Sequence, residues 1–162
     1  MIGRYAVLAS RIRQDLAEIE RVVRRAERAI AAARQRDANR DLLLDAAALS
    51  LHDCYSGIER LLEQIASIVD QTVPSTSDWH RQLLRQMTVE VSGLRPRVLS
   101  AATATALDEY RRFRHVVRNV YAFELDPVRV EQLTIGLRPA FTQARDELEA
   151  FAAVLRDLAN EE

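Results

Sequence analysis

The sequence predicts an all-α fold, an antiparallel helical bundle of four main helices plus one short helix. Glycine and proline occur only four times each in 162 residues, while the helix formers Ala, Leu, Arg and Glu dominate. Apolar residues recur at spacings of three and four along most of the chain, which is the period of an amphipathic helix. No segment shows the alternation of a strand, and the length is most simply that of one domain, residues 1–162.

Two long helices are predicted first, over residues 4–36 and 40–70. The first carries one apolar seam, made of Tyr5, Leu8, Ile12, Leu16, Ile19, Val23, Ala26, Ile30 and Ala33. Asn39 or Asp37 lies where the second helix needs an N-cap. Gly57 costs about 1 kcal/mol relative to alanine in a helix, so we expect a close helix contact there. Long helices joined by a short loop form an antiparallel hairpin.

A shorter third helix is predicted over residues 78–92. Ser77 or Asp78 is expected to cap it, and Gly93 and Pro96 are expected to end it. The fourth helix, over residues 101–123, is expected to begin at an N-cap formed by Ser100.

A last helix is predicted from residue 127 to about residue 160. Asp126 followed by Pro127 is the pattern of an N-cap with proline at the first helical position. Gly136 and Pro139 are expected to kink or divide this helix.

Composition narrows the classes of function. The net charge is −1, so attraction for nucleic acid has to come from a local patch. Cys54 is the only cysteine, which excludes an intramolecular disulfide and a cysteine-based zinc cluster. No cofactor and no metal are expected. The sequence has neither a membrane-spanning apolar stretch nor a signal-peptide pattern, so we expect a cytoplasmic protein without membrane contact.

The most unusual stretch lies in the fourth predicted helix, over residues 111–126. A rotation of about 100° per residue groups four apolar side chains on one face. These are Phe113, Val116, Val117 and Val120. The opposite face gathers Arg114, His115, Arg118, Asn119 and Tyr121, with Arg111 one turn before His115. The pattern predicts a core stripe backed by a cationic polar face suited to an anion.

Two interpretations of this polar face stay open. Charge-rich helix faces are usually solvated or paired with acids of neighbouring helices, such as Glu59. Alternatively, an arginine–imidazole cluster suits phosphodiester cleavage, because arginine neutralises charge at phosphorus while histidine moves protons near neutral pH. Structural roles are favoured for His52, beside Asp53 and Cys54, and for His80 at a predicted helix start.

The segment from Arg114 to Tyr121, followed by Phe123-Glu124-Leu125-Asp126, resembles the signature helix of the HEPN superfamily, and most closely its HepT-like toxin branch. The phrase from Asp78 to Leu84, with Gln86-Met87 and Arg95-Pro96, resembles a subgroup of HepT-like domains. The resemblance covers most of the chain and is specific between residues 78 and 126.

The resemblance implies a HEPN-like helical bundle that forms a homodimer with two signature helices across a cleft. It implies a metal-independent endoribonuclease acting on RNA, paired with an MNT-type nucleotidyltransferase antitoxin. That antitoxin would add AMP to the signature tyrosine, here Tyr121. Arg111, Arg114 and Arg118 would bind RNA, and Arg114, His115, Arg118 and Asn119 would form the catalytic set.

The chain departs from the family pattern at one position. With Arg114 and Tyr121 aligned, Asn119 stands where the pattern has its catalytic histidine. An amide cannot transfer a proton, so either His115 has taken over this role or cleavage has been lost. The leading hypothesis is therefore a HepT-like toxin that cleaves RNA. The alternatives are a catalytically inactive HEPN-type scaffold that binds RNA or protein, and a structural dimer whose polar face is filled with ion pairs.

Overall fold

The fold is all-α, as predicted. The computed structural model describes residues 2–35, 37–119 and 125–161, with the side chains of Ile2, Arg118 and Asn119 left aside. The long helices are α1 (Ile2–Gln35), α2 (Arg40–Ile65), α4 (Ala101–Asn119) and α5 (Pro127–Asn160). The short helix α3 spans Trp79–Met87, and α2 continues into a π-helical turn, η1 (Ala66–Asp70). No strand and no helix able to cross a membrane occurs in this described part of the chain.

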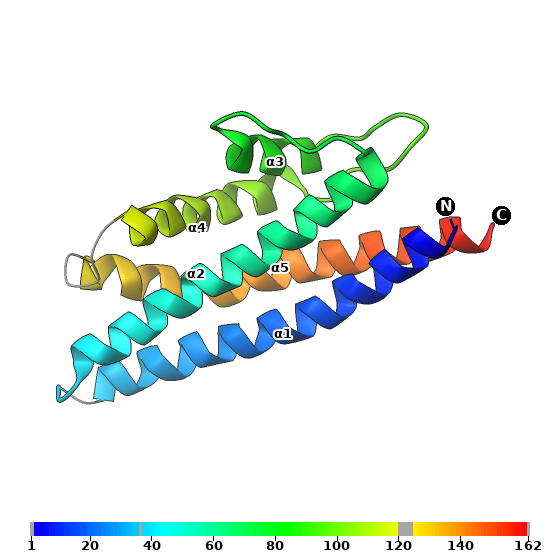
Figure 1. The fold of residues 1–162 in the computed structure, drawn as a ribbon. Coiled ribbons are helices and arrows are strands. Elements are labelled where there is room, and N and C mark those ends of the chain that lie inside the picture. Colours follow the sequence, from blue (N-terminus) through cyan, green and yellow to red (C-terminus); the bar gives the residue numbers. More distant parts are fainter. Residues whose placement is uncertain (1, 36, 120–124, 162) are drawn as a thin grey trace.

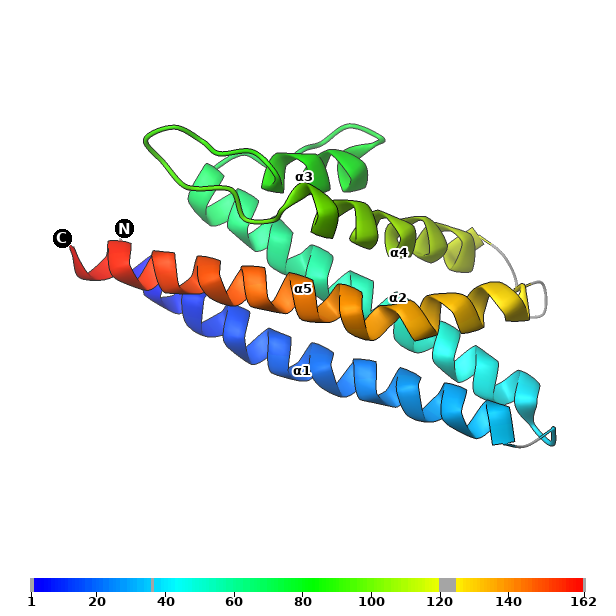
Figure 2. The same ribbon diagram turned by 180° about the vertical axis from the view of Figure 1, so that it is seen from behind.

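Helices α1, α2 and α5 form the main body (Figure 1). Helix α1 runs antiparallel to both α2 and α5, so the two ends of the chain lie at the same end of the molecule. Helices α4 and α3 lie on the other side of α2, as the reverse view also shows (Figure 2). The predicted α1 seam is buried from Leu8 to Ala33, with Tyr5 partly buried at its start.

Gly57 marks the close approach of α2 to α1. A Cβ at this position would lie 2.9 Å from Cγ1 of Ile19, which is closer than side chains tolerate. The absence of a side chain therefore lets α1 and α2 approach closely, and their packing offsets the free-energy cost of glycine in a helix.

Helix α5 is undivided, so the expectation that Gly136 and Pro139 might divide it was wrong. Pro139 is exposed one turn after Ile135, so water can reach the carbonyl that lost its N–H partner. Gly136 has a separate role, because a Cβ there would lie 3.2 Å from the hydroxyl of Tyr110. That hydroxyl donates to the carbonyl of Leu133 at 2.8 Å and ties α4 to α5.

The predicted N-caps differ in detail. Ser100 caps α4, since its Oγ accepts from the Thr103 amide at 3.2 Å. Asn39 and Asp78 occupy the cap positions of α2 and α3 without a side-chain cap bond, and Asn39 adopts a left-handed φ of 62°. Asp126 caps α5, accepting from the Val128 amide at 3.0 Å.

We expect Asp126→Ala to lower the free energy of unfolding by about 1 kcal/mol, because the first turn of α5 would lose its side-chain acceptor. Chemical denaturation measures the change. Glu149→Ala, at an exposed position inside the same helix, is the control and should stay within about 0.5 kcal/mol of the wild type. Equal effects of the two changes would contradict the assigned cap.

The third helix is shorter than predicted, because it ends at Met87 instead of residue 92. The amides of Val98 and Leu99 both donate to the Met87 carbonyl, at 2.9 and 3.0 Å, and so turn the chain back across the helix end. A tight turn from Val91 to Arg95 follows, with Gly93 at a φ of 73°. The segment over residues 88–99 is thus an ordered loop.

Arg95 holds this loop. Its guanidinium makes a two-pronged ion pair with Asp70 at the end of η1, with Nη2 2.7 Å from Oδ2. It also donates to the carbonyls of Val89, Gln86 and Pro96 at 2.9, 3.2 and 3.0 Å. All five N–H donors of the side chain are used, which explains how a fully buried arginine is tolerated.

Candidate functional site

The buried face of α4 overlaps only in part with the one that the sequence predicted. Phe113 is buried and Val117 is partly buried, as expected, but Val116 is 45 % exposed and Arg114 is only 8 % exposed. The helix packs against α2, α3 and α5, and its buried stripe passes through Arg114. The predicted separation of a core face from a polar face holding Arg114 was therefore wrong.

Arg114 points into a polar cluster between α2, α3 and α4, which we call the Glu59 cluster (Tyr55, Glu59, His80 and Arg114). Nη1 of Arg114 lies 2.6 Å from Oε1 of Glu59, whose side chain is 4 % exposed. The other carboxylate oxygen, Oε2, lies 2.8 Å from Nδ1 of His80. One buried carboxylate on α2 thus binds a cation from α4 and an imidazole from α3.

The cluster contains the aromatic ring of Tyr55, and the ring of Trp79 packs against it. The guanidinium of Arg114 lies 5.6 Å from the centre of the Tyr55 ring, within the range of a cation–π contact. The Tyr55 hydroxyl is buried and has no hydrogen-bond partner among the described residues. Burial, with the nearby Glu59 charge, raises the pKa of Tyr55 well above its usual value, so the phenol stays protonated. Trp79 stacks on His80, with ring centres 3.7 Å apart.

Glu63 stands one helical turn after Glu59. Burial and the charge of Glu59 together raise its pKa above the usual value, although His80 and Arg114 oppose the shift. The region therefore holds two neighbouring carboxylates with different surroundings, one bound by a cation and one with a raised pKa.

The other arginines near the start of the signature stretch have acidic partners. Asp108 accepts from Nε of Arg111 at 2.6 Å and pairs with Arg112 at 3.0 Å. Burial alone would raise the pKa of Asp108, but the two arginines outweigh it and the pKa lies below the usual value. The hydrogen bond to Asp108 raises the pKa of Arg111. The expected ion pair with an acid of a neighbouring helix is thus present at Arg114, whereas Arg111 pairs with an acid of its own helix.

Three of the remaining predicted site residues, His115, Arg118 and Asn119, belong to the last part of α4. His115 is exposed, whereas Arg114 beside it is buried. The backbone of Arg118 and Asn119 belongs to α4, but their side chains and the whole of Tyr121 lie outside the described residues.

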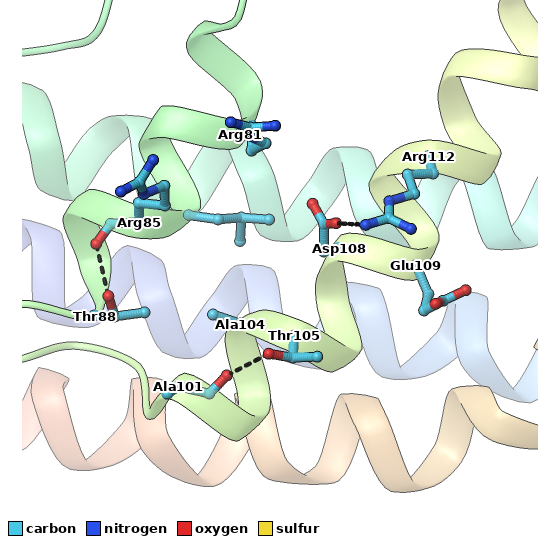
Figure 3. Close-up of a pocket in the computed structure, with 10 residues that line it drawn as sticks. Arg81, Arg85, Thr88, Ala101, Ala104, Thr105, Asp108, Glu109 and Arg112 are labelled. Carbon is cyan, nitrogen blue, oxygen red and sulfur yellow. Dashed lines mark hydrogen bonds and ion pairs between the residues drawn. The ribbon is translucent and has the colours of Figure 1, made fainter.

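A groove of about 460 Å³ runs between α3 and α4 (Figure 3). Leu84, Ala101 and Ala104 contribute apolar lining, and Arg81, Arg85 and Arg112 contribute cationic lining. Figure 3 shows the Arg112 side chain held by Asp108, which also lines the groove. The groove is thus of mixed charge, and it lies next to the helix that carries His115.

Cys54 and His52 do not form a nucleophilic pair. Cys54 is buried, and burial raises the pKa of its thiol to about 12, so the thiolate is not available near neutral pH. Nδ1 of His52 lies instead 3.3 Å from Asp53.

The sequence interpretation missed the pairing of Glu59 with His80. A signal for half of it is present, because Glu59 lies one turn from Tyr55 and Leu62 on the buried stripe of α2. An acidic residue on such a stripe requires a buried partner. Nothing in the local sequence of α3 indicates that His80, 21 residues later, provides one.

Comparison with known proteins gives one family. A family described as HepT-like protein matches residues 46–155, which include the Glu59 cluster, the α3–α4 groove and His115. No curated protein and no solved structure matches the chain.

Proposed function

The chain belongs to the HepT-like family, and from this membership we propose that it is the toxin component of a toxin–antitoxin pair, acting as a metal-independent endoribonuclease. The observation that carries the proposal is the family match over residues 46–155, which encloses the helix bearing the signature stretch. The exposed His115 on that helix supports it, because an imidazole open to solvent can reach a phosphodiester.

The proposed roles follow the signature stretch, with one revision. His115 acts as a general acid or base, Arg118 binds the scissile phosphate, and Asn119 orients the phosphate or a 2′-hydroxyl. Arg114 is assigned a positioning role in place of direct phosphate binding, since its guanidinium is already bonded to Glu59 inside the protein. Tyr121 is the proposed acceptor of AMP.

The proposed partners are a second copy of the chain and an MNT-type nucleotidyltransferase antitoxin. In a homodimer, two copies of α4 would bring their cationic ends together and strengthen the field that attracts RNA. The half-exposed Val116 on α4 supports an interface there, because burial of its apolar side chain between two subunits would remove it from water and favour association.

A specific observation also favours the second candidate function, a catalytically inactive scaffold that binds RNA or protein. Asn119 replaces the histidine of the family pattern, and the arginine of the same pattern is engaged by Glu59. Both features are compatible with a protein that has kept the family fold and lost the ability to cleave RNA. RNA binding that weakens in Arg118→Ala, without any cleavage, would select this candidate.

The proposed activity is tested by incubating the purified protein with labelled RNA in EDTA. We expect cleavage by the wild type, because no step in the proposal needs a metal ion. His115→Ala should slow cleavage by about 10²–10⁴-fold if its imidazole transfers a proton. His52→Ala, on α2 and paired with Asp53, is the control and should cleave normally. Absence of cleavage, or cleavage unchanged in His115→Ala, would remove the enzymatic proposal.

A further inference from the structure

His80 is held through one ring nitrogen, Nδ1, while Nε2 makes no hydrogen bond to any residue that the structure describes. We propose that His80 is a second proton-transfer residue of the site, held by Glu59 through Nδ1 so that Nε2 faces the ribose 2′-hydroxyl of bound RNA. This inference rests on the proposed endoribonuclease function. It assigns a role to a residue outside the signature helix, at the point where α3 meets the arginine of that helix.

The contacts of His80 define which ring nitrogen carries the proton. Nδ1 lies 2.8 Å from Oε2 of Glu59 and 3.2 Å from Nη2 of Arg114. A nitrogen lone pair facing an ionised carboxylate at 2.8 Å would be repelled, so a proton lies between Nδ1 and Glu59. Nη2 of Arg114 lies near Nδ1 of His80 because both side chains donate to the carboxylate of Glu59. Neutral His80 is therefore the Nδ1–H tautomer, and Nε2 carries the lone pair.

The surroundings keep Nε2 available. The His80 side chain is 27 % exposed, whereas the Glu59 side chain is 4 % exposed. Nε2 makes no hydrogen bond within the described part of the chain. Stacking on Trp79, with an interplanar angle of 29°, limits rotation of the ring. A carboxylate that orients an imidazole from behind also stabilises the imidazolium formed when Nε2 takes a proton.

The position of His80 would let it supply the imidazole that the signature helix lacks at Asn119. The signature helix lacks its pattern histidine, and an amide cannot replace the imidazole in proton transfer. His80 comes from α3, yet it lies in direct contact with Arg114, the arginine of the same pattern. An imidazole is thus present beside the motif arginine although it enters from another helix.

The proposed step balances without a metal or an oxidant. Nε2 of His80 takes the proton of the ribose 2′-hydroxyl as its oxygen attacks phosphorus. The bond between O2′ and phosphorus forms, and the bond between phosphorus and O5′ breaks. The leaving O5′ takes a proton from a second acid, the role left for His115 in the proposed function. The products are a 2′,3′-cyclic phosphate and a 5′-hydroxyl, and His80 then returns its proton to solvent.

The test compares wild type, His80→Ala and His80→Asn in the EDTA cleavage assay. The amide of asparagine places an N–H donor where Nδ1 lies, so His80→Asn keeps the bond to Glu59 and separates loss of the proton-transfer group from loss of the cluster. We expect both variants to cleave about 10²–10⁴-fold more slowly, while binding of a 2′-deoxy RNA analogue measured by fluorescence anisotropy stays unchanged. Added imidazole should restore part of the rate in His80→Ala.

His52→Ala is a close match as a control, because its imidazole is 26 % exposed and also contacts a carboxylate, Asp53. It should leave rate and binding unchanged. The pH–rate profile adds a readout that a structural role would not move. His80→Asn should lose the limb of the profile that belongs to the base, with Glu59 and Glu63 on α2 and Arg114 on α4 still present in both proteins.

Each outcome decides between the proposals. Cleavage at the wild-type rate by both His80 variants would overturn the role of His80 and leave the proposed endoribonuclease standing. Slower cleavage that is accompanied by loss of RNA binding, or that imidazole does not rescue, would also overturn it. Absence of cleavage by the wild type would overturn both inferences together.

Discussion

Replacing Arg95 by methionine is expected to lower the free energy of unfolding by about 3–5 kcal/mol, because Asp70 would keep a buried charge without its cation. The Arg95 side chain is fully buried and the Asp70 side chain is 6 % exposed. The carbonyls of Val89, Gln86 and Pro96 would lose a charged donor at the same time. For a domain of this length, such a loss corresponds to roughly 6–20 °C in Tm.

Thermal and denaturant unfolding followed by circular dichroism would measure the effect. Arg97→Met is the matched control, since Arg97 lies in the same loop, two residues away, and is exposed. It should change stability by less than about 0.5 kcal/mol. If Arg95→Met and Arg97→Met behaved alike, the view that Arg95 holds the loop to η1 would be wrong.

The long helices could be predicted because their evidence is local. The α1 seam repeats every three or four residues over most of the helix, and the cap formed by Asp126 and Pro127 is a short-range pattern. Both are present in the structure: α1 starts two residues and ends one residue earlier than predicted, and α5 has its predicted bounds. A continuous α5 was not predictable in the same way, because the effect of Pro139 depends on whether water reaches the carbonyl one turn earlier.

The end of α3 could not be predicted from propensity. Residues 88–92 contain no strong helix breaker, and Gly93 and Pro96 lie beyond the observed end. The helix stops at Met87 because the chain returns across it and because Arg95 finds Asp70, 25 residues earlier. The resemblance at Arg95-Pro96 thus coincides with an arginine that orders a loop.

The candidate site was predicted only in part, because its contacts also join residues that are distant in the sequence. Rotation around an isolated helix places Arg114 about 100° from Phe113 and outside the apolar arc, and a single helix allows no better assignment. In the structure both are buried, because α4 packs against three other helices, α2, α3 and α5. Which polar residue is drawn inward depends on Glu59, 55 residues away in sequence. Spacing along one helix carries no information about that partner.

The second large effect is expected at this pair. Arg114→Met should destabilise the protein by about 3–5 kcal/mol, because Glu59 would then keep a buried negative charge facing only His80. Glu59→Met should cost a similar amount by leaving the Arg114 guanidinium buried without its carboxylate. The double variant removes both charges and fills the space with apolar side chains, so it should recover most of the loss.

A double-mutant cycle from denaturant unfolding measures the coupling, and a coupling energy near zero would contradict the buried ion pair. The double variant then separates folding from chemistry. It should fold nearly as stably as the wild type, yet His80 would have lost the carboxylate that orients Nδ1. If His80 transfers a proton in the proposed reaction, this stable variant should cleave RNA more slowly than the wild type. A stable double variant with undiminished cleavage would show that the ion pair of Glu59 and Arg114 serves the fold alone, since the reaction would then proceed without either charge.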